Sequence, residues 1–191
     1  MSPVADASAI INLNASGMAA AIIRAMPRLI VVDVVLQELE YGRPKGRRDA
    51  ELLHALIDQG VVELVTLSDE AEAHFERLVV GAAEATLDDG EAATIAHAIV
   101  TGGVAVIDER KAKRLCATHY PNLVIHTTVD VLAAPAIEAQ LGKDALADCV
   151  FKALQHGRMR VAPERLDWVL ERIGEERARL CESLPQRIWK R

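Results

Sequence analysis

The sequence lacks the features of several large protein classes. Its three cysteines are scattered and form no C-x-x-C pair, which argues against a disulfide framework and against a zinc site. No apolar run reaches the ~18 residues that a membrane span needs. The N-terminus has no basic stretch followed by an apolar signal core. We therefore expect a soluble, cytoplasmic protein with no membrane contact.

Common nucleotide and protease motifs are also missing. The sequence contains neither a P-loop nor a dinucleotide fingerprint, and its six histidines show no metal-ligand spacing such as H-E-x-x-H. The net charge of −6 argues against a protein that grips nucleic acid with its whole surface. The excess of carboxylates indicates either a solvated surface, which is the commoner case, or a site where metal ions neutralise them. Their positions must decide between the two.

The chain is long enough to bury one substantial core. Its 191 residues, 51% of them hydrophobic, fit a single domain with a small appendage. Short apolar runs alternate with amphipathic helical patterns, which predicts an α/β fold with a parallel five-stranded sheet flanked by helices. The predicted strands are Pro3 to Asp6, Leu29 to Val32, Val61 to Leu67, Val104 to Ile107 and Leu123 to Thr127.

The last third of the chain shows no further strand. Its pattern predicts helices over about 129–141, 144–156 and 163–180. Pro135 should kink or end the first of them, because proline removes a backbone donor and clashes with the preceding turn. We expect an α/β domain over residues 1–130 and a helical C-terminal extension over residues 131–191 that packs on it.

Acidic residues gather where the predicted strands end. In an open parallel sheet, ligands bind outside the carboxyl ends of the strands, where loops and helix starts converge. Acids at this edge therefore matter most. The acids that end these strands or begin the following helices are Asp6, Asp33, Glu38, Glu91, Asp108 and Glu109.

The spacing between Glu91 and Asp108 can be examined by geometry. A helix of about eleven residues climbs ~16 Å, and a strand of about four residues returns ~13 Å. Glu91 should therefore lie beside Asp108 and Glu109. Glu38 and Glu40 lie about 200° apart around a helix, so only one of them can face this edge, and we select Glu38.

Carboxylates that lie close together at one edge of the sheet need positive charge beside them. They cannot all stay ionised without compensation, because each raises the pKa of the others. Mg²⁺ or Mn²⁺ prefers oxygen ligands and keeps several waters, which leaves positions for phosphate oxygens and an attacking hydroxide. Two such ions would stabilise the entering and leaving oxygens of an in-line phosphodiester displacement. The pattern favours a metal-dependent nuclease.

Four segments around these acids resemble the PIN-domain family, which includes the VapC-type toxin ribonucleases. Residues 4–8 (VADAS) resemble the opening strand followed by Asp-x-Ser, and residues 36–42 (LQELEYG) resemble the Glu-Leu-x-x-Gly helix end, which supports Glu38 over Glu40. Residues 89–93 (DGEAA) and 106–113 (VIDERKAK) match the third and fourth acidic positions in the form of a divergent, less characterised branch. The resemblance covers roughly residues 3–130, and the order and spacing of all four segments carry it.

The resemblance implies a Rossmann-like PIN fold and an endoribonuclease that uses Mg²⁺ or Mn²⁺. It assigns a supporting role to the hydroxyl of Ser8. It further implies RNA as substrate, a role as the toxin of a toxin–antitoxin pair with an antitoxin protein as partner, and a homodimer. The metal ligands and catalytic residues so expected are Asp6, Glu38, Glu91 and Asp108, with Glu109 as alternate or helper ligand.

Basic residues flank the predicted site. A loop directly after the Glu38 helix concentrates cations, and a second group shares one helix face by its three-and-four spacing. Charge runs are usually just solvated, but beside an acidic metal site they would hold the RNA backbone. The predicted RNA-binding residues are Arg43, Lys45, Arg47, Arg48, Arg110 and Lys113.

Purely structural roles compete with these assignments. Asp33 and Asp88 are most simply helix N-caps, and Asp88 with Glu91 three residues later resembles a capping box. Asp6 taken alone is equally a turn residue or a ligand. The presence of Ser8 two residues later favours a role for Asp6 as a metal ligand.

Two other functions compete with the nuclease. Classical PIN domains show Thr-x-Asp where this chain has Asp108-Glu109, which motivates a PIN-like module that has lost catalysis and serves as a nucleic-acid or protein-binding platform. A phosphoryl-accepting receiver domain also needs an acidic pocket. It would additionally want a lysine at the end of the last strand, where this chain has His126, Thr127 and Thr128.

Overall fold

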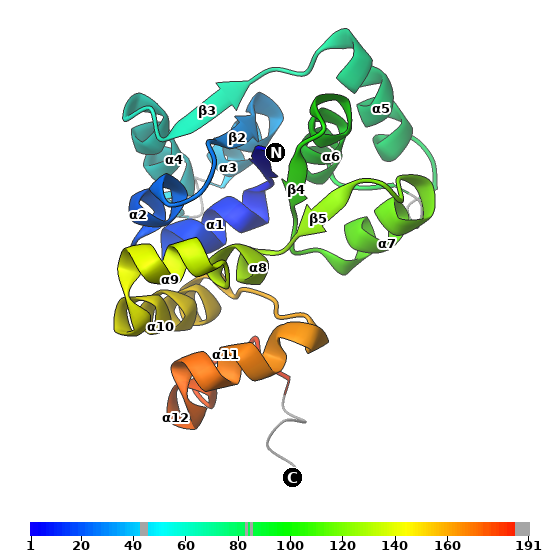
Figure 1. Cartoon of the computed structure of the whole chain (residues 1–191). Helices are drawn as coiled ribbons and strands as arrows, with labels where there is room; N and C mark the ends of the chain where they lie inside the picture. The colour runs from blue at the N-terminus through cyan, green and yellow to red at the C-terminus, as the bar shows by residue number, and fades with distance from the viewer. Residues whose placement is uncertain (43–45, 83, 85, 186–191) are drawn as a thin grey trace.

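The structure is a computed structural model that describes residues 1–42, 46–82, 84 and 86–185. A central sheet carries helices on both faces, and the helices that follow the last strand gather beyond α1 (Figure 1). Within the described residues, no helix is long and apolar enough to cross a membrane.

The sheet has five parallel strands in the order β3-β2-β1-β4-β5. This confirms the predicted α/β fold with a five-stranded parallel sheet. Four of the strands end one or two residues earlier than the sequence predicted, and the residues directly after β1 and β5, Asp6 and Thr127, are the N-caps of the next helices. The strands are β1 (Pro3–Ala5), β2 (Leu29–Val32), β3 (Val62–Val65), β4 (Val104–Val106) and β5 (Val124–His126).

Alternate residues of the central strands face two separate hydrophobic clusters. In β1, Ala5 joins one cluster and Val4 the other, and β2 divides in the same way between Val31 and Val32. This is the period of two that a strand imposes on its side chains. Because both faces are covered, the strands are almost entirely apolar.

The helices divide between the two clusters. The first cluster holds α1 (Ala7–Ala15), α2 (Ala19–Arg24), α3 (Asp33–Tyr41) and α4 (Asp49–Asp58). The second cluster holds α5 (Asp69–Val79), α6 (Asp89–Thr101) and α7 (Arg110–His119). Helix α6 ends at Gly102, whose φ of 63° lets the chain reverse into β4. The chain thus returns to the edge where α6 began.

The C-terminal segment is helical, as predicted, but its helices are shorter than the sequence indicated. Pro135 starts a new helix instead of kinking one, which suits its missing backbone donor. Gly174, with a φ of 77°, separates two further helices. The elements are α8 (Thr128–Leu132), α9 (Pro135–Leu141), α10 (Lys143–Lys152), the π-helix η2 (Ala153–Gly157), the 3-10 helix η3 (Pro163–Arg165), α11 (Leu166–Ile173) and α12 (Glu175–Ala178).

These C-terminal helices share the first hydrophobic cluster with the sheet. Leu146, Val150 and Leu154 are buried in the cluster that contains Ile10 and Leu13 of α1. The π-helix η2 packs directly against α1. The boundary at residue 130 stays a prediction, because one continuous core spans both sides of it.

Candidate active site

The predicted acids lie at the carboxyl edge of the sheet. Asp6 follows β1, and Asp108 lies two residues past β4. These strands are neighbours, and the Asp6 backbone N–H donates to the Val106 carbonyl at 3.2 Å. Glu91 belongs to the first turn of α6, which starts at the same edge. Glu91 and Asp108 line one hollow of 230 Å³, as the spacing argument predicted.

Asp6 is the most deeply buried of these acids, with 2% of its surface exposed. As the N-cap of α1, its carboxylate accepts the Ala9 N–H at 2.7 Å, and the Ser8 hydroxyl donates to both of its oxygens at 3.0 and 2.9 Å. Burial, together with the nearby Asp108 and Glu91 carboxylates, raises the pKa of Asp6 to about 8, while the Ala9 and Ser8 donors act to lower it. Asp6 therefore caps a helix, and its ionised form is costly unless a positive charge lies nearby.

Asp108 is held by three donors. Asn12 Nδ2 donates to Oδ2 at 2.7 Å, the Thr128 N–H donates to Oδ1 at 2.8 Å, and the Thr128 hydroxyl donates to Oδ2 at 2.7 Å. Burial raises the pKa of Asp108 while these donors lower it. The carboxylate is thus fixed in orientation by residues of α1 and α8.

Glu91 and Glu38 form the other half of the acidic group. Burial, together with the Asp88, Glu109 and Glu38 carboxylates, raises the pKa of Glu91 to about 7. Burial, with Asp88 and Asp89, raises the pKa of Glu38 as well. Glu38 Oε2 lies directly over Gly90, where a Cβ would collide with it. The Glu38 carboxylate therefore sits against the first turn of α6.

The acidic residues that were expected to cap helices make only part of the expected hydrogen bonds. Asp88 occupies the N-cap position of α6, but its side chain makes no capping hydrogen bond. Glu91 accepts the Asp88 backbone N–H, so only half of the expected capping box is present. Asp33 is the first residue of α3 instead of its N-cap, and its carboxylate accepts the Val34 N–H at 2.8 Å. Glu40 points elsewhere, to His54 at 3.1 Å.

Basic side chains border this acidic hollow. Arg160 pairs with Glu109, and both line the hollow together with Arg47 and Arg158. Arg110 lines a neighbouring hollow that also contains Arg160.

The other basic residues that were predicted to bind RNA either pair with acidic side chains or lie outside the described residues. Arg48 pairs with Glu51 at 3.0 Å, and Lys113 lies 3.9 Å from Glu164. The predictions for Arg43 and Lys45 lie outside the described residues.

Sequence reasoning missed four residues of this site: Asn12, Gly157, Arg158 and Arg160. Asn12 had a signal, since it follows Ser8 by four residues and is the polar residue on a buried face of α1. Gly157 packs so closely on α1 that a Cβ there would collide with Asn12 Oδ1. Nothing in the sequence indicated the two arginines, because they reach the acidic hollow only through the packing of η2 on α1.

The metal-ligand roles stay predictions. Across the residues that the structure describes, no group of three or more His, Cys, Asp or Glu side chains is placed to hold a metal ion. The donor set nevertheless fits a hard cation, because it consists of carboxylate oxygens. A bound cation would also offset the burial and mutual repulsion that raise the pKa of Asp6 and Glu91.

Comparisons with known proteins give one family. The model of the family DUF3368, described as a PIN domain, matches residues 2–175. The search of curated proteins found no match. Among solved structures, a crystal structure of VapBC2 from Rickettsia felis bound to a DNA fragment from its promoter is similar, with 17% identity and a TM-score of 0.44. That similarity covers 66% of this chain and 98% of the other.

Proposed function

The chain belongs to the PIN-domain family, and from this premise we propose that it is an endoribonuclease dependent on Mg²⁺ or Mn²⁺. The family membership confirms the resemblance read from the sequence. Metal dependence and RNA cleavage are our own inference. The residues proposed to hold the metal are Asp6, Glu38, Glu91 and Asp108, with Glu109 as an alternate ligand.

The observation that carries the proposal is the electrostatic state of Asp6. The residue is 2% exposed, and the charges of Asp108 and Glu91 raise the pKa of its carboxyl group. Natural proteins rarely bury an acid beside two others without a compensating charge. Divalent cations coordinated by these oxygens would supply that charge. The clustering of acids from separate segments thus supports a cation site.

The surrounding residues would hold these acids in position. Ser8 donates to both oxygens of Asp6, while Asn12 and Thr128 fix Asp108. Fixed orientation matters because catalytic groups must sit close to the productive geometry before substrate arrives. The divalent cations, when bound, would activate water and stabilise the charge that develops on the cleaved phosphate. Arg47 and the neighbouring cations would contact the RNA backbone.

Asp6→Asn tests the proposal. Asparagine keeps the shape and the ability to cap α1, but it removes the negative charge. We expect loss of Mn²⁺-dependent RNA cleavage with an unchanged circular dichroism spectrum. Asp58→Asn is the matched control, because Asp58 is exposed and lies at the opposite edge of the sheet, just before β3. Unchanged cleavage by Asp6→Asn would overturn the proposed metal site, and a wild type that does not cleave RNA with Mn²⁺ would overturn the nuclease proposal.

A second candidate, a PIN-like binding module without catalysis, is favoured by one specific arrangement. Both oxygens of Asp108 already accept hydrogen bonds, and Glu109 is paired with Arg160. Titration of Mn²⁺ by calorimetry separates the candidates. Binding that Glu91→Gln weakens supports the nuclease, whereas no binding, or binding that this variant leaves unchanged, supports the inactive module.

The toxin role, the antitoxin partner and the homodimer belong to the same proposal. Expression of the chain should then arrest growth, and expression of the Asp6→Asn variant should not. Light scattering of the purified chain gives its oligomeric state directly. A monomeric mass at micromolar concentration would contradict the homodimer alone.

A further inference from the structure

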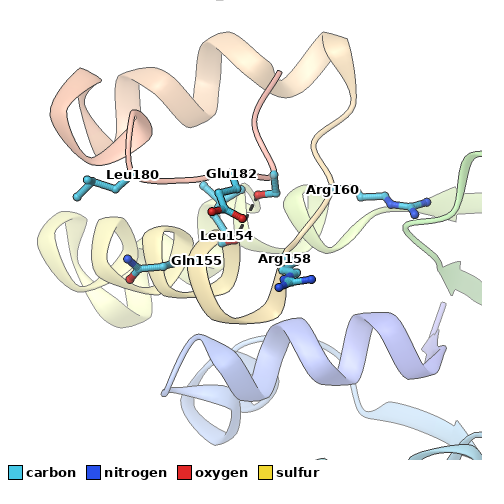
Figure 2. A pocket seen from close by; sticks show the side chains of 7 residues that line it. Leu154, Gln155, Arg158, Arg160, Leu180 and Glu182 are labelled. Atoms are coloured by element: carbon cyan, nitrogen blue, oxygen red, sulfur yellow. Dashed lines mark hydrogen bonds between the residues drawn. The ribbon is translucent and has the colours of Figure 1, made fainter. Parts of the chain in front are cut away.

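A second hollow, of 690 Å³, opens beside the acidic one. It lies between η2 and the segment 180–183, and Figure 2 shows its lining side chains. Arg158 and Arg160 line both hollows, so the two spaces meet at these arginines. The volume falls within the range of about 300–1,000 Å³ that is usual for ligand pockets. A chain held at the acidic edge would therefore meet both arginines before it reached the second hollow.

Arg158 is held in an unusual backbone conformation. Its φ of 57° makes it the one residue other than glycine, within the described ranges, that adopts the left-handed region. Such a conformation is costly for a residue with a Cβ, and here it ends η2 as its C-cap, where the Arg158 backbone N–H donates to the Ala153 carbonyl. Its guanidinium makes neither a hydrogen bond nor an ion pair with another described residue. The guanidinium therefore lines the junction of the two hollows without a described partner and is available to bind an anion.

The chemical character of the hollow changes along its length. Figure 2 shows Arg158 and Arg160 at one end, and Gln155 and Leu180 at the other. Leu180 is 62% exposed, which is high for so apolar a side chain. Glu182 adds a carboxylate to the lining, which disfavours a phosphate deeper in the hollow. The hollow thus offers cations for phosphates at one end, and apolar and amide surface for a base at the other.

We propose that this hollow binds the single-stranded RNA next to the phosphate that is cleaved, with Arg158 and Arg160 on the backbone and Leu180 and Gln155 against a base. This rests on the proposed nuclease function. Single-stranded RNA is the class that fits, because its phosphates track a basic groove while its unpaired bases turn onto side chains. A duplex keeps its bases stacked and cannot place one against Leu180.

The first test measures binding apart from cleavage. Fluorescence anisotropy with a labelled oligouridine RNA in EDTA, at several salt concentrations, gives the affinity and its salt dependence. Loss of one phosphate contact to a single strand reduces the slope of log affinity against log salt by about 0.7, or about fourfold in affinity at ~0.15 M salt. We expect this for Arg158→Asn, which removes the charge but tolerates the left-handed backbone.

Two further variants serve as controls for charge and position. Arg158→Lys keeps the charge and should retain the slope. Arg28→Ala removes an exposed arginine just before β2, at the opposite edge of the sheet, and should leave binding unchanged.

The second test concerns the base. Leu180→Ser should weaken binding by at least about fourfold for each CH₂ group that the RNA covers, with an unchanged salt slope. A duplex of the same length should be insensitive to this substitution.

The outcomes separate the subsite from the nuclease. If Arg158→Asn and Leu180→Ser bind oligouridine as the wild type does, while Asp6→Asn abolishes cleavage, the subsite is wrong and the nuclease stands. If both variants weaken binding while Asp6→Asn still cleaves, the hollow binds RNA but the metal site is misassigned. Equal sensitivity of duplex and single strand to Leu180→Ser would also overturn the subsite.

Discussion

Arg160 and Glu109 form an ion pair that ties the C-terminal segment to the residue after Asp108. The side chains are 63% and 36% exposed, so the pair stabilises the fold by only about 0–1 kcal/mol. Its main consequence is local, because a guanidinium stands at the rim of the acidic hollow. There it competes with a metal ion for Glu109 and attracts phosphate.

Arg160→Ala should separate these two effects. Without the guanidinium, Glu109 is available and the positive charge near the metal site falls, so Mn²⁺ should bind about three- to tenfold more tightly by calorimetry. RNA should bind more weakly in the anisotropy assay, because a phosphate contact is lost. The melting temperature should change by less than about 4 °C. Weaker Mn²⁺ binding would show that Arg160 orients Glu109 instead of competing for it.

Gly90→Ala should affect the metal site without harming the fold. The new Cβ would collide with Glu38 Oε2, which is the far end of a flexible side chain and can move away. Alanine is also favoured over glycine inside a helix by about 1 kcal/mol. We expect unchanged or higher thermal stability by calorimetry, together with weaker Mn²⁺ binding. A variant that binds Mn²⁺ as the wild type does would show that Glu38 is not a ligand.

Gly157→Ala, in contrast to Gly90→Ala, should destabilise the fold. Its Cβ would meet Asn12 Oδ1 and would lie 3.2 Å from Asn12 Cα and from Ala15 Cβ, so the backbone of α1 blocks any easy escape. Overpacking of this kind costs about 1–3 kcal/mol. The melting temperature should fall by roughly 2–12 °C, since each kcal/mol shifts it by about 2–4 °C in a chain of this size. A variant as stable as the wild type would indicate that η2 packs loosely on α1.

The architecture could be predicted because it depends on local patterns. Short apolar runs predicted all five strands, and the polar residues near their ends marked the edge where Asp6 and Asp108 lie. The C-terminal helices were harder to delimit. Pro135 indicated one break, but the apolar periodicity continues past Gly174 and into the π-helix, so the other breaks were not predicted.

The site could be predicted only in part, for a physical reason. The acids could be recognised because they follow predicted strands. The lengths of the helix and the strand between Glu91 and Asp108 were enough to predict that these two residues lie side by side. Asn12, Gly157 and Arg158 act through the contact between α1 and η2, which are far apart in sequence. Such a contact forms only when the chain packs in three dimensions, so it could not be predicted from the spacing of residues along the sequence.

The metal-free protein should lose stability as pH rises from about 5 to 8. Burial raises the pKa of Asp6 to about 8 and that of Glu91 to about 7, from 3.8 and 4.5. Between these values, the native state holds protons that the unfolded chain has released. The stability from this difference is complete below the unfolded pKa and is lost as pH approaches the folded pKa. The slope is at most about 1.4 kcal/mol per pH unit for each such group.

Melting temperatures in EDTA at pH 5 and pH 8 measure this loss, with Asp6→Asn as the matched variant. His97 acts in the opposite sense, because burial lowers its pKa, but it does so equally in both proteins. The variant should therefore show a smaller fall between the two pH values. Mn²⁺ should restore the stability of the wild type most at pH 8, because the metal binds the ionised carboxylates. A wild type and a variant with identical pH dependence would mean that Asp6 is ionised in the native state.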